Sequence, residues 1–117
     1  MNSHKDLEAW KNSIDLVFDI YNLTRLFPKE EIFGLTQQLR RAIVSVPSNI
    51  SEGAARNQKR EFIRFLRISS GSLAEAETQL LIAYRQQYFS SYEMTRLSNN
   101  IKTIRIQISG LIRSLEQ

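Results

Sequence analysis

The stretch that decides how this chain folds is residues 35–57, LTQQLRRAIVSVPSNISEGAARN. Its apolar residues recur at steps of three and four, which places them on one face of an α-helix. Together with Ile32, three residues before the stretch, they are Leu35, Leu39, Ile43, Val46, Ile50 and Ala54. Pro47 removes one helical hydrogen bond and crowds the carbonyl of Ile43, so we expect a bent helix. Gly53 then offers the chain a way out of the helix.

Apolar residues with the same spacing predict a helix on either side of this stretch. The earlier one should end near Phe27-Pro28, because the residue before a proline disfavours helical geometry. Its stripe consists of Leu7, Trp10, Ile14, Val17, Phe18 and Tyr21. The later helix should begin with Asn57 as its N-cap. Its apolar side consists of Phe62, Phe65, Leu66, Ser69, Leu73, Ala76, Leu80 and Tyr84.

A fourth helix is predicted after Ser90, which forms a capping box with Glu93. Its seam alternates steps of four and three, the spacing of a helical bundle. The seam residues are Leu97, Ile101, Ile104, Ile108, Leu111 and Leu115. Because the connections are short, neighbouring helices should be antiparallel. The sequence therefore predicts an all-α fold, an antiparallel up-and-down four-helix bundle forming a single domain over residues 1–117.

The composition supports a globular chain in a reducing compartment. Of its 117 residues, 42% are apolar and 24% are charged, and cysteine is absent. The polar N-terminus has no apolar segment typical of a signal peptide. No apolar run reaches the roughly 18 residues that suggest a membrane span. We expect a cytoplasmic protein without membrane contact.

The sequence offers little for catalysis or metal binding. His4, the single histidine, lies near the terminus and leaves no internal imidazole for acid–base work. Ser45, Asn49 and Glu52 share one helix face, but no base accompanies the serine, as nucleophilic catalysis requires. We interpret these three as a hydrogen-bonding set between helices or between subunits. The prediction is a non-enzyme with no catalytic residues, no metal and no cofactor.

Positive charge is concentrated in the middle of the chain. The net charge is +4, and residues 40–67 hold seven of the 16 basic residues but two of the 12 acidic ones. A basic surface of this kind favours anionic partners. Alternatively, these side chains serve only to solvate the helices.

Four arginines lie within about 80° of one another on a helical wheel; they are Arg56, Arg60, Arg64 and Arg67. Each cation near a helix N-terminus destabilises the helix by roughly 0.3–1 kcal/mol. An anion-binding site at this position would explain why the sequence places cations there. The nucleic-acid-binding candidates are Arg56, Lys59, Arg60 and Arg64, supported by Arg40 and Arg41 if these face outward. In the alternative, Glu52 and Glu61 neutralise the cluster, either within the chain or across a subunit boundary.

Gly71 lies in the middle of a predicted helix, where glycine loses about 1 kcal/mol against alanine. Close approach of another backbone is a physical reason for that cost. We therefore predict a subunit contact at RISSGS, residues 67–72. The full set of oligomer-contact candidates is Arg67, Gly71, Ser45, Asn49 and Glu52.

Four blocks along the chain resemble one family, the four-helix-bundle proteins encoded in intervening sequences of bacterial 23S ribosomal RNA genes. The blocks are DLEAW (6–10), FPKEEIFGL (27–35), QLRRAIVSVPSNISEGAARN (38–57) and EFIRFLRISSGSLAEAETQL (61–80). The resemblance implies a four-helix bundle that assembles as a ring-like homopentamer. A related branch resembles the accessory variability proteins of diversity-generating retroelements, which work beside RNA and a reverse transcriptase.

Two functions follow as hypotheses. In the first, the chain is an oligomeric accessory protein associated with RNA or another nucleic acid, with a possible protein partner such as a reverse transcriptase. In the second, it is an oligomeric scaffold for protein interactions, without nucleic-acid binding. Exposed arginines favour the first hypothesis, and arginines buried in interfaces favour the second.

Overall fold

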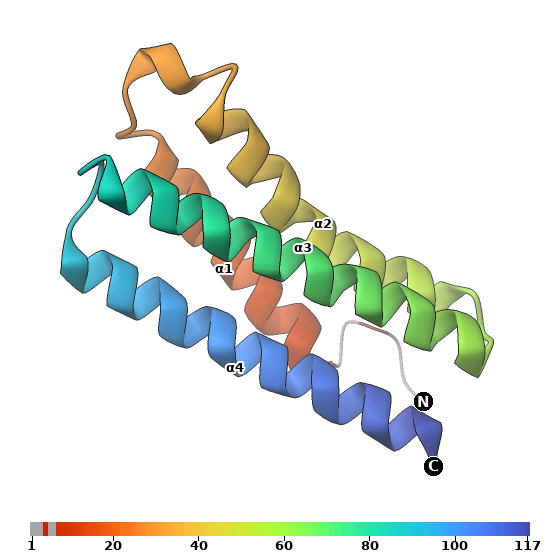
Figure 1. Cartoon of the computed structure of the whole chain (residues 1–117). Coiled ribbons are helices and arrows are strands. Elements are labelled where there is room, and N and C mark those ends of the chain that lie inside the picture. Colours follow the sequence, from red (N-terminus) through yellow and green to blue (C-terminus); the bar gives the residue numbers. More distant parts are fainter. Residues whose placement is uncertain (1–3, 5–6) are drawn as a thin grey trace.

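The structure is a computed structural model that describes residue 4 and residues 7–117. Its elements are α1 (Glu8–Thr24), the short 3₁₀ helix η2 (Lys29–Glu31), α2 (Leu35–Ala55), α3 (Lys59–Arg85) and α4 (Ser91–Glu116). The four α-helices run up and down in one elongated bundle, with extents of 44 × 25 × 19 Å (Figure 1). The predicted all-α four-helix bundle is confirmed.

Each helix packs against two neighbours around one apolar core. α1 packs against α2 and α4, and α3 packs against the same two helices. The turn between α2 and α3 lies near the C-terminus, and the α1–α2 connection lies near the α3–α4 turn at the other end (Figure 1). No helix in the described part of the chain is long and apolar enough to cross a membrane.

Burial confirms most of the predicted seams of α3 and α4, but Tyr84, Leu111 and Leu115 are only partly buried, and Ile112 takes the buried position at the end of α4. From α3, the buried residues include Phe62, Phe65, Leu66, Ser69, Leu73, Ala76 and Leu80. From α4, they are Leu97, Ile101, Ile104, Ile108 and Ile112. The Ser90 hydroxyl caps α4 by accepting a hydrogen bond from the Glu93 amide at 3.2 Å.

The predicted core stripe of α1 is wrong in its direction. The buried residues of α1 are Ala9, Ser13, Leu16, Ile20, Leu23 and Thr24. Trp10 and Val17 pack only partly against the core, and Phe18 is 67% exposed. The reason is that α1 has apolar residues on two faces. The face with small residues packs inward, because Ala9 and Ser13 fit between neighbouring helices.

Two details of α2 differ from the sequence prediction. Ile32 is exposed and lies before the helix. Pro47 lies inside the helix, as expected, and is buried. Gly53 does not end the helix. A Cβ atom on Gly53 would lie 2.7 Å from the Cβ of Phe65, so this glycine allows α2 and α3 to approach closely.

The exit from α2 is at Asn57, which has a φ of 58°. Asparagine tolerates this left-handed conformation better than most residues with a side chain. Asn57 therefore turns the chain after α2. The prediction that Asn57 is the N-cap of α3 is wrong, since Gln58 holds that position and makes no side-chain cap.

Candidate nucleic-acid interface

Four predicted basic residues lie around the α2–α3 turn and the first turns of α3. Arg56, Lys59, Arg60 and Arg64 are all exposed, and together we call them the α3 basic surface. Arg56 follows α2 directly, and Lys59 is the first residue of α3. The short turn between the helices brings Arg56 beside the start of α3, although Arg56 lies outside the helix on which the helical wheel placed it.

An aromatic ring supports two of these cations. The guanidinium of Arg64 lies 4.5 Å from the centroid of the Phe65 ring, and that of Arg56 lies 5.1 Å from it. A guanidinium over a ring face is attracted by the ring quadrupole. Sequence reasoning assigned Phe65 to the core alone and missed this role. The adjacency of Arg64 and Phe65 gave no signal, because neighbours on a helix usually point apart.

Two carboxylates partly neutralise the α3 basic surface. Arg56 pairs with Glu52 at 2.9 Å, and Arg64 pairs with Glu61 at 3.1 Å. The hydrogen bond from Arg64, with the nearby charges of Arg56 and Arg60, lowers the pKa of the Glu61 carboxyl. Glu61 is therefore ionised at neutral pH. Neutralisation within the chain, one of the alternatives for this cluster, occurs for these two arginines.

The other two cations are less engaged. Lys59 donates to the backbone oxygen of Gln117 at 3.4 Å. Arg60 forms no ion pair with any residue that the structure describes. A surface depression of 570 Å³ lies beside Arg60 and extends to Gln58 and Arg67. Since no side chain caps this end of α3, its first amides are available beside the cations.

Arg67 belongs to a separate contact. Its guanidinium pairs with Glu116 of α4 at 3.0 Å. This ion pair connects α3 to the end of α4 on the surface. Arg67 therefore has a partner within the chain as well as its predicted place at an oligomer contact.

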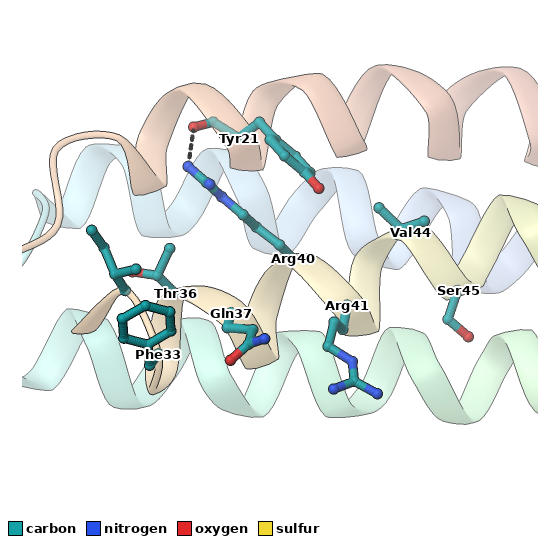
Figure 2. Close-up of a pocket in the computed structure, with 9 residues that line it drawn as sticks. Tyr21, Phe33, Thr36, Gln37, Arg40, Arg41, Val44 and Ser45 are labelled. Atoms are coloured by element: carbon teal, nitrogen blue, oxygen red, sulfur yellow. Dashed lines mark hydrogen bonds between the residues drawn. The ribbon is translucent and has the colours of Figure 1, made fainter. Parts of the chain in front are cut away.

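Arg40 and Arg41 do not join the α3 basic surface. They lie about 24 Å from Arg56 along α2, at about 1.5 Å per residue. Arg40 turns toward α1, where it donates to Thr24 Oγ1 at 2.8 Å. Its guanidinium also stacks over the ring of Tyr21 and donates to the Tyr21 carbonyl oxygen (Figure 2). Arg41 is exposed and points the other way, toward α3 (Figure 2).

The polar residues predicted to bond between helices or subunits are engaged within the chain. Ser45 and Ser72 share a hydrogen bond of 2.8 Å between α2 and α3, and Asn49 donates to Ser45 Oγ at 2.9 Å. Glu52 does not join these hydrogen bonds and instead forms an ion pair with Arg56. Gly71 is exposed, and an added Cβ would meet no atom within 4 Å. Close approach within one chain therefore does not explain this glycine.

The fold and the α3 basic surface define the class of protein: a small up-and-down four-helix bundle with exposed cations at the start of α3. Comparison with known protein families then identifies the family. The chain belongs to the 23S rRNA-intervening sequence protein family, whose model matches residues 5–110. The resemblance read from its four sequence blocks is confirmed.

A solved structure shares this fold. It is the 1.70 Å crystal structure of a protein with unknown function from the S23 ribosomal protein family of Bacteroides thetaiotaomicron VPI-5482. It superimposes with a TM-score of 0.81 at 23% sequence identity, over 89% of this chain and 97% of that chain. Curated proteins gave no match.

Proposed function

We propose that this protein is a non-enzymatic accessory protein of the bacterial cytoplasm that binds structured RNA through the α3 basic surface. The observation that carries the proposal is the exposure of all four cations beside uncapped amides of α3. Helix amides and guanidinium groups are both good partners for phosphate oxygens. The name of the family, which refers to 23S rRNA, agrees with an RNA partner.

The contacts within the surface suit phosphate binding. Phe65 holds Arg56 and Arg64 in place, so less side-chain entropy is lost when they bind. Arg60 keeps its guanidinium free of carboxylates in the described chain. Glu52 and Glu61 oppose an anion, which limits the affinity of one copy. An oligomer, such as the homopentamer that the sequence resemblance implies, would offset this limit by repeating the surface.

Fluorescence anisotropy with labelled structured RNA across a salt series tests the proposal. The variant Arg56→Ala/Arg60→Ala/Arg64→Ala should bind at least about tenfold more weakly, with a reduced salt slope, because phosphate contacts are lost. The matched control is Arg85→Ala/Arg105→Ala/Arg113→Ala, which removes the same charge from exposed positions elsewhere. Equal losses in both variants would show a net-charge effect without a site. Circular dichroism and gel filtration check the fold and assembly.

The second candidate, a protein-interaction scaffold, is favoured by the outer face of α1. There Phe18 is exposed, and Ile14 and Tyr21 are only partly buried. A contiguous apolar face of this kind is typical of a protein contact. Absence of RNA binding even at low salt would leave the scaffold as the better account.

A further inference from the structure

A groove of 560 Å³ lies along the N-terminal half of α2, apart from the α3 basic surface. We call it the α2 groove. Its walls are Tyr21 of α1, Ile32 and Phe33 before α2, and residues of α2 between Thr36 and Ser45 (Figure 2). Its volume falls within the roughly 300–1,000 Å³ typical of small-molecule sites.

The charge of the groove is uncompensated. Arg40 and Arg41 line it, and none of its lining residues is acidic. Neither arginine forms an ion pair with a residue in the described ranges, 4 and 7–117. This contrasts with Arg56 and Arg64, which have carboxylate partners. The groove therefore favours an anion.

Arg40 is held in position before any ligand arrives. Its Nε donates to Thr24 Oγ1 at 2.8 Å, its Nη2 reaches the Tyr21 carbonyl at 3.4 Å, and its Cζ lies 4.5 Å from the centroid of the Tyr21 ring. These contacts use the side of the guanidinium that faces α1. The cation is preorganised, so less of its side-chain entropy is lost on pairing with a ligand.

The remaining walls provide apolar contact and one unused polar group. Phe33 is 89% exposed, and Ile32 and Val44 are exposed as well. Thr36 is only 5% exposed, and its hydroxyl oxygen, which has no hydrogen-bond partner in the described structure, is shielded from solvent. A buried hydroxyl without a partner is unfavourable, and a ligand oxygen would reach it only if this wall rearranged.

We propose that the α2 groove binds a small organic anion with an aromatic or branched-aliphatic body. Its carboxylate or sulfonate pairs with the preorganised Arg40, and the exposed side chain of Arg41, which points toward α3 in the free chain, turns to join it. Its apolar body packs against Tyr21, Phe33 and Val44. This site is independent of RNA binding, because the α3 basic surface lies at the other end of α2. The occupant is a small molecule because the groove matches one in volume and has two cations without a carboxylate partner along α2.

Two dyes with the same ring system test the proposal: anilinonaphthalene sulfonate, an anion, and phenylnaphthylamine, which is neutral. Fluorescence titration should show one saturable site per chain, with the anion bound about fivefold or more tightly than the neutral dye. Arg41→Gln should remove most of this difference. Val44→Glu should abolish binding of the anionic dye, because it places a carboxylate and extra volume in the groove.

Matched controls locate the dye. Ile68→Glu makes the same kind of change on α3 at a position that is 39% exposed, against 37% for Val44, and should leave binding unchanged. Equal affinity for the two dyes, or unchanged binding in Val44→Glu, would overturn the proposal. So would loss of binding in Phe18→Ser alone, which would place the dye on the outer face of α1. If the dye does not bind and Val44→Glu splits an oligomer, the groove is a contact between copies instead.

Discussion

At the scale of single residues, Gly53 sets how closely α2 and α3 can pack. We predict that Gly53→Ala destabilises the fold by roughly 1–3 kcal/mol, because its Cβ would overlap that of Phe65. The measurement is urea unfolding followed by circular dichroism. An unchanged or increased stability would contradict the close approach.

Gly71 is the matched control for this glycine. It lies in α3 with open space where a Cβ would be, so Gly71→Ala should stabilise the chain by about 0.5–1 kcal/mol through helix propensity. If the same change instead weakens an oligomer, another copy approaches Gly71. That result would support the subunit contact predicted at residues 67–72.

Tyr88 makes the stability of the fold decrease at alkaline pH. Its hydroxyl donates to Glu31 Oε2 at 2.8 Å, and this bond to a carboxylate raises the pKa of Tyr88. A raised folded-state pKa contributes stability below the unfolded pKa of about 10, which is lost as pH rises through the folded value. Tyr88→Phe should therefore flatten the fall in unfolding free energy above about pH 10. Tyr92→Phe, an exposed control, should leave that fall unchanged.

At the scale of helices, Arg96 fastens α4 to α1. Its guanidinium donates to both carboxylate oxygens of Asp19, at 2.6 and 2.9 Å, and also pairs with Glu93. Both side chains of the Arg96–Asp19 pair are about one-third exposed. Bidentate geometry makes the pair stronger than a typical surface pair, and partial solvation reduces the gain.

We predict a coupling of about 1 kcal/mol for this pair in a double-mutant cycle with Arg96→Gln and Asp19→Asn. The Arg105–Glu77 pair joins α3 and α4 with a single contact of 3.0 Å between more exposed side chains. Its coupling should be smaller, below about 0.5 kcal/mol. Thermal unfolding of the four variants in each cycle gives both values. Equal couplings would show that the second oxygen of Asp19 adds nothing.

Helix α1 shows where periodicity fails as a guide. Its sequence contains one apolar stripe through Trp10, Ile14 and Phe18, and another through Leu16 and Ile20. Both have helical spacing, so the pattern predicted the helix correctly but could not decide which stripe enters the core. In α3 and α4, by contrast, the apolar spacing did indicate which side of the helix is buried.

At the scale of the whole molecule, the outer face of α1 exposes the Phe18 side chain in the part of the chain that the structure describes. If it mediates self-association, Phe18→Glu should shift the protein toward the monomer in sedimentation velocity while the helical signal stays intact. Ile106→Glu places the same charge at another exposed apolar position, on α4, and should not change the distribution. A similar shift in both variants would show general charge repulsion.

The sequence alone determined the four helices, their antiparallel order, the family and the exposure of Arg56, Arg60 and Arg64, because local spacing and short connections encode these features. Only the tertiary structure decided which face of α1 is buried and that Gly53 marks a close helix contact. It also decided that Phe65 supports two guanidinium groups and that Arg40 faces a groove rather than the α3 basic surface. These features depend on which side chains meet across helices, and helical periodicity carries no information about that.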